Sequence, residues 1–151
     1  MRQTFVIASD KAEIATVEER LFHFCELCNA GNYFSAVSVA TLNAVENAIV
    51  HGNRGESDKK VTVSVGECTG GMFVEVADQG SGFDYKTYGD LPIDAAAHGV
   101  GIFIMERLAD KVEFFDGGSR VRLEFVFSGI DETVAESRAA LVGDARTAPV
   151  S

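Results

Sequence analysis

The chain has 151 residues, of which 13 are lysine or arginine and 23 are aspartate or glutamate, so its formal net charge is −10. A composition of 46% hydrophobic and 24% charged residues is typical of a globular protein and excludes a chain that is disordered throughout. A single domain of this length buries about 70% of the surface that its unfolded chain exposes, whereas two full domains would be cramped. Because clustered basic residues bind phosphates and anionic lipids, the acidic balance argues against nucleic acid or a membrane as partner and favours a basic protein.

The sequence has no segment of the roughly 18 apolar residues that a membrane span requires, and residues 1–10 lack the features of a secretory leader. We therefore expect a cytoplasmic protein. Cys25 and Cys28 form a CxxC pair within an apolar helical run. A zinc site is disfavoured there, because only His23 and the distant Cys68 could complete the four ligands. We expect both thiols of the pair to be buried and reduced.

The first third of the chain has helical periodicity. Residues 5–7 predict a short strand, and the polar residues 9–10 predict the cap of a helix that ends near Asn29. The apolar face of this helix repeats every three or four residues, at Ile14, Val17, Leu21, Phe24 and Leu27. A second helix is expected over residues 34–51, with an apolar face made by Leu42, Val45 and Ile49.

The rest of the chain combines hairpins with a long loop and a short helix. In chain order the expected elements are strands 61–65 and 73–77, a loop over 79–99, a helix over 102–109, and strands 112–115 and 121–127. Because βαβ alternation is missing, we expect an α+β fold, a two-layer α/β sandwich whose mixed, mostly antiparallel sheet carries its helices on one face. We expect this domain to span residues 1–128 and the tail over 129–151 to be mobile rather than packed.

Two asparagines on the second predicted helix indicate a ligand. Asn43 and Asn47 are four residues apart, so both project along one stripe beside the apolar face. Asparagine is a poor helix former, and its amide both donates and accepts hydrogen bonds, so the pair is typical of a binding stripe, which His51 ends. The alternative explanation is two solvated amides on an exposed face.

Two glycine-rich segments occur farther along the chain. Residues 78–82 (DQGSG) follow a predicted strand directly, and residues 98–101 (HGVG) open a predicted helix. Glycines let backbone N–H groups approach phosphates, and a helix N-terminus favours negative charge, so these segments indicate a phosphate cradle. Asp78 at the strand end can accept a hydrogen bond from an exocyclic amine, which distinguishes adenine from guanine. Each segment alone is also explained by turn chemistry, whereas the ordered combination is specific.

Four segments together resemble the motifs of the GHKL ATPases, the superfamily of gyrase, the large heat-shock chaperones, histidine kinases and MutL. They are residues 46–53 (ENAIVHGN), 78–83 (DQGSGF), 99–105 (GVGIFIM) and 118–121 (GSRV). The likeness covers roughly residues 5–127. Within the superfamily, the short chain resembles the anti-sigma-factor serine kinases of the RsbW and SpoIIAB type.

This resemblance implies an ATP site with the Bergerat fold. In such a site Asn47 ligates the Mg²⁺ bound to the phosphates, Asp78 recognises adenine, Gly80 and Gly82 shape the adenine pocket, and residues 84–98 form a lid. The other residues implied to bind the nucleotide are Asn43, His51, His98, Gly99, Val100, Gly101 and Ser119. Among these, the two glycines hold phosphates and the serine supports adenine. One amide oxygen plus a triphosphate suits Mg²⁺, which keeps several waters.

Two departures from the family pattern bear on catalysis. The serine kinases carry a glutamate four residues before the box asparagine, where this chain has Asn43, and an amide cannot act as a general base. The pair Asn43 and Asn47 instead resembles the asparagine box of histidine kinases. Glu46 lies about 80° around the helix from the asparagine stripe, so the sequence leaves the catalytic base unassigned. In the lid, only Lys86 and His98 could neutralise a γ-phosphate.

The resemblance implies an ATP-binding anti-sigma regulatory factor. Such a protein sequesters a sigma factor and exchanges it for an anti-sigma antagonist, with or without phosphorylating a serine of that antagonist, and acts as a homodimer. Two alternatives stay open at this point. One is a catalytically silent module in which ATP only shifts partner affinity, and the other is a stand-alone histidine-kinase-like catalytic half.

Overall fold

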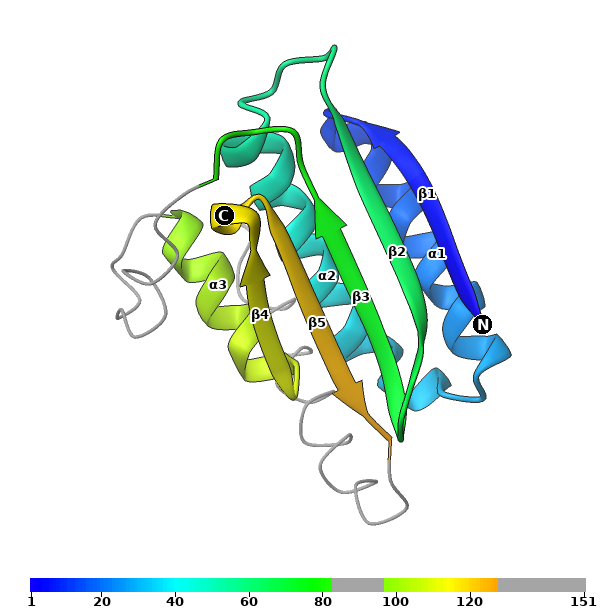
Figure 1. The fold of residues 1–151 in the computed structure, drawn as a ribbon. Helices are drawn as coiled ribbons and strands as arrows, with labels where there is room; N and C mark the ends of the chain where they lie inside the picture. Colours follow the sequence, from blue (N-terminus) through cyan, green and yellow to red (C-terminus); the bar gives the residue numbers. More distant parts are fainter. Residues whose placement is uncertain (83–96, 128–151) are drawn as a thin grey trace, which may run out of the picture.

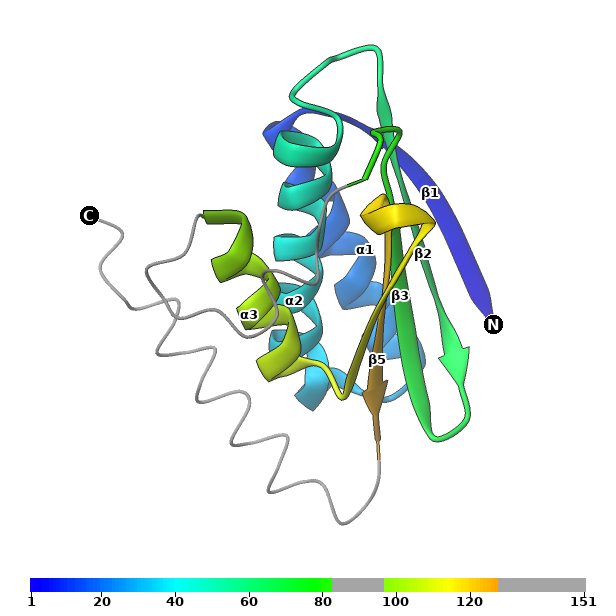
Figure 2. The same ribbon diagram turned by 60° about the vertical axis from the view of Figure 1, so that its left-hand side comes forward.

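A five-stranded sheet forms one layer of the protein and its helices form the other (Figures 1 and 2). The computed structural model describes residues 1–82 and 97–127, with only the helical backbone described for residues 97–100. The strands are β1 (Arg2–Ala8), β2 (Lys60–Cys68), β3 (Gly71–Ala77), β4 (Lys111–Phe115) and β5 (Arg120–Val126). The helices are α1 (Ile14–Leu27), α2 (Phe34–Asn47) and α3 (Ala97–Leu108), and all three cover the same face of the sheet. The expected two-layer α+β architecture is confirmed.

The strands lie in the order β1-β2-β3-β5-β4. Both predicted hairpins form, since β2 pairs with β3 and β4 pairs with β5. The two hairpins are joined by the pairing of β3 with β5, and β1 adds to the outer edge of β2. Each of these four pairings is antiparallel, so the described sheet contains no parallel pair where a mixed sheet was expected.

The core lies between the sheet and the helices, and the period of two in the strands supplies it. Alternate residues of β2, β3 and β5 point toward the helices and are buried, namely Val61, Val63, Val65, Met72, Val74, Val76, Val121, Leu123 and Phe125. Helix α1 contributes Val17, Leu21, Phe24 and Cys25, each with an exposed fraction of 0%.

The prediction for the end of α1 was wrong for Leu27 and for Cys28. Leu27, placed on the apolar face, is 63% exposed, and Cys25 packs into the core one turn after Leu21 instead. Cys28 lies just beyond the helix, is half-buried, and donates through its thiol to Glu67 Oε1 at 3.5 Å. Burial raises the pKa of Cys25 to about 12, so that thiol stays protonated. The expectation of two buried thiols therefore holds for Cys25 only.

The second and third helices differ from expectation at one end each. The helix predicted over residues 34–51 forms as α2 followed by a π-helical turn at Ala48–Gly52, in which Asn53 N–H donates to Ala48 O at 2.8 Å. Helix α3 begins at Ala97, five residues before the expected start at 102. The glycine pair predicted to precede α3 thus lies inside its first turns. Residues 84–96 of the expected lid and the tail over 129–151 lie outside the described residues.

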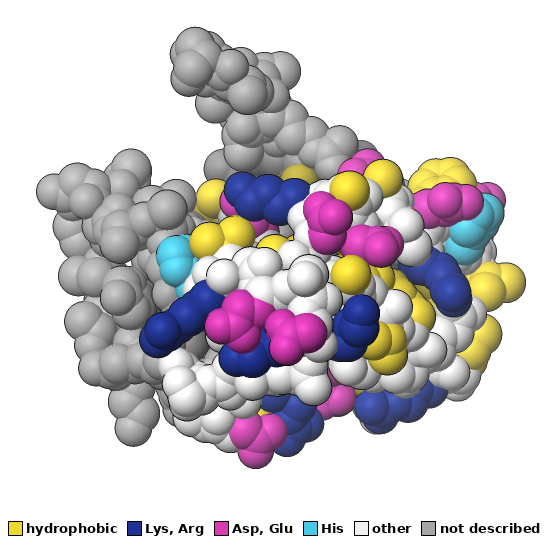
Figure 3. Space-filling model, turned by 90° about the horizontal axis from the view of Figure 1, so that it is seen from above, with side chains coloured by type: hydrophobic (Ala, Val, Ile, Leu, Met, Phe, Trp, Pro, Cys, Tyr) yellow, Lys and Arg dark blue, Asp and Glu magenta, His cyan; other side chains and the backbone are white. Residues whose placement is uncertain are grey.

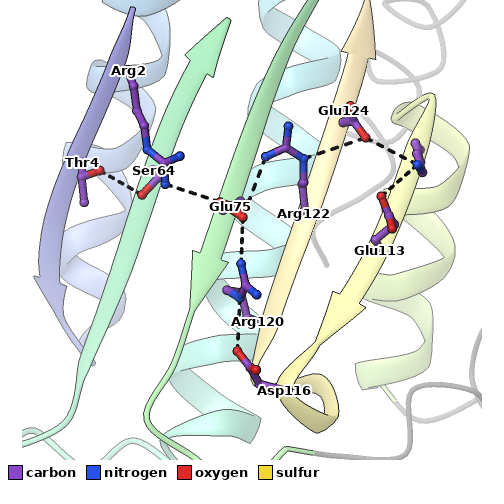
Figure 4. A network of polar contacts seen from close by, with 10 residues as sticks. Arg2, Thr4, Ser64, Glu75, Glu113, Asp116, Arg120, Arg122 and Glu124 are labelled. Atoms are coloured by element: carbon purple, nitrogen blue, oxygen red, sulfur yellow. Dashed lines mark hydrogen bonds and ion pairs between the residues drawn. The ribbon is translucent and has the colours of Figure 1, made fainter. Parts of the chain in front are cut away.

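The face of the sheet that the helices do not cover carries a network of charged side chains (Figure 4). Glu75 on β3 lies at its centre, with Arg120 Nη1 at 3.0 Å, Arg2 Nη2 at 3.6 Å and Arg122 Nη1 at 3.9 Å from its carboxylate oxygens. The network continues to Glu124 and to the edge strand β4.

Among the described helices, none has the length and apolar character that crossing a bilayer requires.

Candidate functional site

Four chain segments meet at one end of the molecule, where α2 and β3 end and where α3 and the turn before β5 begin (Figure 1). They enclose a cavity, which we call the Asp78 cavity. Its lining residues are Ala44, Asn47, Ala48, Gly52, Val76, Asp78, Met105, Phe114, Gly118, Ser119 and Val121. The structure therefore brings together the predicted site residues Asn47, Asp78 and Ser119.

A second hollow adjoins this cavity on the other side of Asn47, which lines both. We call it the Glu46 hollow, and its lining residues are Lys11, Asn43, Glu46, Asn47, Val50, His51 and Gly101. It collects the predicted residues Asn43, His51 and Gly101. Figure 3, which looks onto this end of the molecule, shows basic and acidic side chains interspersed there.

Asp78 is held at the end of β3 by backbone hydrogen bonds. Its own N–H donates to Ser119 O at 2.8 Å, which continues the pairing of β3 with β5 by one residue. Its Oδ1 accepts from the N–H of Gly80 at 2.8 Å. Burial raises the pKa of Asp78, while the Gly80 N–H and the positive charge of Lys59 lower it. The half-buried carboxylate keeps a second oxygen as an acceptor for a ligand.

Glycine backbone forms the walls around Asp78. A Cβ on Gly52 would overlap the Asp78 carboxylate, and a Cβ on Gly80 would overlap the carbonyl oxygen of Gly52. Gly82 has a φ of 88°, and a Cβ there would overlap the carbonyl oxygen of Gly117. The predicted glycines at 80 and 82 are thus required by close packing and, at 82, by backbone conformation. The contact of Gly52 with Asp78 was not predicted from the sequence.

Asn47 faces the start of α3. An ideal Cβ on Gly101 would lie 3.2 Å from Asn47 Nδ2 and 3.3 Å from Asn47 Oδ1, so glycine allows the helix to approach the amide closely. Asn47 Nδ2 is buried and has no hydrogen-bond partner among the described residues. An unsatisfied buried polar atom costs about 1–3 kcal/mol, and such atoms in native proteins are often satisfied by a ligand or an ordered water. Asn47 is therefore the described side chain most suited to bind a ligand between the two hollows.

Asn43 and Glu46 occupy different positions in the Glu46 hollow. Asn43 Nδ2 donates to Val39 O in the preceding turn of α2 at 2.8 Å, and its Oδ1 lies toward Gly101. Glu46 is exposed, and its Oε1 lies 3.6 Å from Lys11 Nζ. The sequence predicted that Glu46 points away from the asparagine stripe, whereas the structure places it in the same hollow as both asparagines.

The remaining predicted residues have less defined roles. The hydroxyl of Ser119 donates to Asp116 O at 3.1 Å, so the side chain is engaged in its own turn while its carbonyl holds Asp78. His98, Gly99 and Val100 lie in the first turn of α3, at the N-terminal end that faces this site. Lys86 lies outside the described residues.

Asn53 was not assigned a role from the sequence, although it belongs to the first motif. Its side chain is fully buried and makes three hydrogen bonds. Nδ2 donates to Ser9 Oγ at 2.8 Å and to Lys60 O at 2.9 Å, and Oδ1 accepts from Gln79 N–H at 2.7 Å. Asn53 thus ties the ends of β1 and β2 to the residue after Asp78. In the sequence, the feature that could have pointed to this role is the position of Asn53 between a predicted helix and a predicted strand.

Comparison with known proteins agrees with this geometry. Residues 7–125 match the histidine kinase-like ATPase domain. The chain is 28% identical over 137 residues to the anti-sigma F factor of Clostridium botulinum strain Eklund 17B, covering 85% of this chain and 94% of that protein. It is equally similar to the anti-sigma F factor of Clostridium botulinum strain Alaska E43. It is 30% identical over 105 residues to the serine-protein kinase RsbW of Listeria innocua, covering 61% of this chain and 67% of that protein.

The family match covers most of the chain, from the end of β1 to the end of β5. It includes the segments that supply Asn47, Asp78 and Gly101, and it confirms the resemblance found in the motifs. The chain therefore belongs to the histidine kinase-like ATPase domain family.

Proposed function

We propose that this protein is a cytoplasmic, ATP-binding anti-sigma regulatory factor, which sequesters a sigma factor and releases it in exchange for an anti-sigma antagonist. The observation that carries the proposal is the convergence of Asp78, its glycine walls and the unsatisfied amide of Asn47 at one end of the fold. The names of the relatives, anti-sigma F factor and serine-protein kinase RsbW, support the regulatory role.

The residues around the Asp78 cavity offer the polar groups that ATP requires, and the cavity, at about 20 Å³, must widen to admit adenine. The adenine would enter the Asp78 cavity, where the free carboxylate oxygen accepts from the exocyclic amine and a guanine carbonyl would be repelled. The phosphates would lie between Asn47 and the N-terminal end of α3, where Gly101 permits a close approach and the helix N-terminus favours anions. His51, Asn43 and Gly101 line the hollow on that side.

The residues also fit Mg²⁺ accompanying the phosphates. Asn47 would supply its amide oxygen, which is a ligand that Mg²⁺ accepts, while its buried Nδ2, which has no partner in the described part of the chain, would donate to a phosphate oxygen. When bound, Mg²⁺ neutralises the charge of the phosphate oxygens. The task of Asn47 is to orient the triphosphate relative to the adenine held by Asp78.

Phosphoryl transfer to a serine would need a group that takes the hydroxyl proton. Asn43 cannot do so, and its amide is held by the carbonyl of Val39. This contact favours, as the second candidate, a catalytically silent module in which ATP only changes partner affinity. Glu46 is the carboxylate in the described hollow, and it is the candidate base if transfer occurs.

Calorimetry with Mg-ATP tests the nucleotide site. Asn47→Ala and Asp78→Asn should each lower ATP affinity by about tenfold to a hundredfold, because each leaves a polar group of the complex unpaired. Asn32→Ala, at an exposed asparagine of a 3-10 turn, is the matched control and should leave affinity unchanged. Unchanged affinity in both site variants would overturn the site, and a preference for GTP would overturn the role of Asp78.

Binding to purified sigma factors, with and without Mg-ATP, tests the regulatory role. We expect one sigma factor to bind and a serine-bearing antagonist to displace it. Labelled ATP then separates the candidates, because acid-stable label on the antagonist indicates serine transfer, acid-labile label a histidine kinase, and no label the silent module. Sedimentation of the same samples tests the homodimer that the family resemblance implies. Failure of every sigma factor to bind would contradict the proposal.

A further inference from the structure

Among the described residues, Lys11 is the only lysine or arginine that lines the Glu46 hollow. It lies in the 3-10 turn Lys11–Glu13 that leads into α1, far in sequence from every glycine or asparagine motif. The turn is anchored, since Asp10 Oδ1 accepts from Ala12 N–H at 2.9 Å. The backbone of Lys11 therefore has a defined position beside α2.

The hollow lies where the outer end of a triphosphate would point. With adenine in the Asp78 cavity and the metal-bound phosphates at Asn47, the chain of phosphates runs out of the cavity past Asn47, because Asn47 lines both spaces. The residues on the far side are Lys11, Glu46, Val50 and His51. A terminal phosphate in this position would meet a negative carboxylate unless a cation lies between them.

The contact between Lys11 and Glu46 leaves the lysine available. Nζ and Oε1 are 3.6 Å apart, and the two side chains are 63% and 53% exposed. An exposed ion pair of this kind adds little stability, about 0–1 kcal/mol, so moving the ammonium costs little. An ammonium group has three donors on a flexible stem, which allows it to contact a phosphate oxygen and a carboxylate at once.

We propose that Lys11 binds the terminal phosphate of the nucleotide and makes the site prefer a triphosphate to a diphosphate. The inference rests on the proposed ATP site and adds a residue that none of the family motifs contains. Lys11 then supplies the positive charge that the sequence located only in Lys86 and His98. Glu46 sets the resting position of the ammonium.

The test compares the affinities for Mg-ADP and for the Mg²⁺ complex of the β,γ-imido analogue of ATP, measured by calorimetry at one ionic strength. Lys11→Gln should lower the affinity for the triphosphate by about tenfold and that for ADP by less than about twofold, because a charge-assisted contact is lost from the terminal phosphate alone. Lys11→Arg should restore most of the loss. Lys111→Gln is the matched control, since Lys111 is also exposed and paired with a glutamate but lies on β4, and both affinities should stay unchanged.

Glu46→Gln separates direct contact from an effect through the carboxylate. If Lys11 acted only by holding Glu46, this variant would reproduce the loss seen in Lys11→Gln, and that outcome would overturn the proposal. We expect Glu46→Gln to leave the preference for the triphosphate intact or increased. Equal losses of affinity for both nucleotides in Lys11→Gln would also overturn the proposal. So would an unchanged triphosphate affinity in Lys11→Gln when the wild type binds both nucleotides. A wild type that binds neither nucleotide would instead reject the ATP site itself.

Discussion

Asn53 shows how a buried amide can position a site without touching the ligand. Its three hydrogen bonds join Ser9, Lys60 and Gln79, and Gln79 is the neighbour of Asp78. Asn53→Ala should lower the free energy of unfolding by about 2–4 kcal/mol, because two donors or acceptors of the main chain and one hydroxyl lose a buried partner. It should also weaken ATP binding, because the turn at residues 78–80 is no longer held.

Ser9→Ala is the control for Asn53. It removes the hydroxyl that accepts from Asn53 Nδ2 and donates to Lys59 O at 2.6 Å, but leaves the bonds of Asn53 to Lys60 and Gln79 in place. We expect a stability loss of about 1 kcal/mol and unchanged ATP affinity. Denaturant unfolding and calorimetry on both variants would show whether the two effects separate, and equal ATP affinities in Asn53→Ala and wild type would contradict the positioning role.

Asp78 predicts a pH dependence of stability with a definite sign. Burial raises its pKa above the ordinary value of 3.8, so the folded state binds this proton more tightly than the unfolded state. The free energy of unfolding should therefore fall as pH rises from the ordinary pKa to the folded-state pKa. Above the folded-state pKa this contribution to the free energy of unfolding no longer changes with pH. Asp78→Asn, whose Oδ1 can still accept from Gly80 N–H, should be more stable than wild type at pH 7. The difference should vanish near pH 3, below both pKa values.

Urea unfolding of both proteins at the two pH values measures this effect. A variant that is less stable than wild type at pH 7 would show that burial of the charge is offset by contacts that the carboxylate makes. Taken with its proposed loss of ATP binding, the expected outcome means that Asp78 lowers stability in the free protein and contributes to affinity in the complex.

The site residues that the sequence could predict are those whose chemistry is local. Asp78, Gly80 and Asn47 belong to motifs with a recognisable spacing, and the structure places all three around one cavity or its wall. Lys11 and Gly52 could not be predicted, because their importance comes from contacts with segments distant in sequence. A lysine near a chain terminus has no local pattern that distinguishes it from a solvated surface residue.

At the level of elements, the close approach of the turns around Asp78 gives a testable prediction. Gly80→Ala would place a Cβ against the carbonyl oxygen of Gly52, so the turn must move. We expect a stability loss of about 1–3 kcal/mol. ATP binding should also weaken by about tenfold, because the same turn holds Asp78. Gly31→Ala is the control, because a Cβ there meets nothing within 4 Å. It should leave ATP binding unchanged and raise stability slightly, by about 0.4–1 kcal/mol.

The start of α3 shows where local rules fail. The sequence predicted that residues 98–101 open a helix over 102–109, and a glycine inside a helix costs about 1 kcal/mol per residue. In the structure Gly101 lies within α3 and against Asn47, where a side chain would crowd the amide. Packing of α3 on α2 thus outweighs helix propensity, which a single sequence does not reveal. The strands were predicted well because an alternating pattern and tight turns define a hairpin without distant contacts.

At the level of the whole molecule, the charged network on the open face of the sheet connects β1 through β4 (Figure 4). The side chain of Glu75 is only 13% exposed, and three arginines surround it. Glu75→Gln should lower the free energy of unfolding by about 1–2 kcal/mol, because Arg120 loses a charge-assisted hydrogen bond and the three arginines, of which Arg2 is 58% exposed, lose their common counter-charge. Added salt should reduce the difference by screening the repulsion between the arginines.

Glu113→Gln is the matched control for Glu75. Glu113 lies on the edge strand β4 and pairs with Lys111 at 3.0 Å, where both side chains are more exposed. We expect a loss of no more than about 0.5 kcal/mol. Thermal and denaturant unfolding of the two variants would decide, and equal losses would mean that the central position of Glu75 has no energetic effect.

The direct pairing of β3 with β5 has a consequence for fragment complementation. Seven residue pairs join these strands, from Gly71 opposite Val126 to Ala77 opposite Arg120, while α3 packs on α2. The interval between Gly82 and Ala97 connects two parts of the chain, residues 1–82 and 97–127, which already share one sheet and one core. A chain cut once within that interval should therefore stay associated as a noncovalent heterodimer, and two separately expressed halves should reassemble the cavity that neither half contains alone.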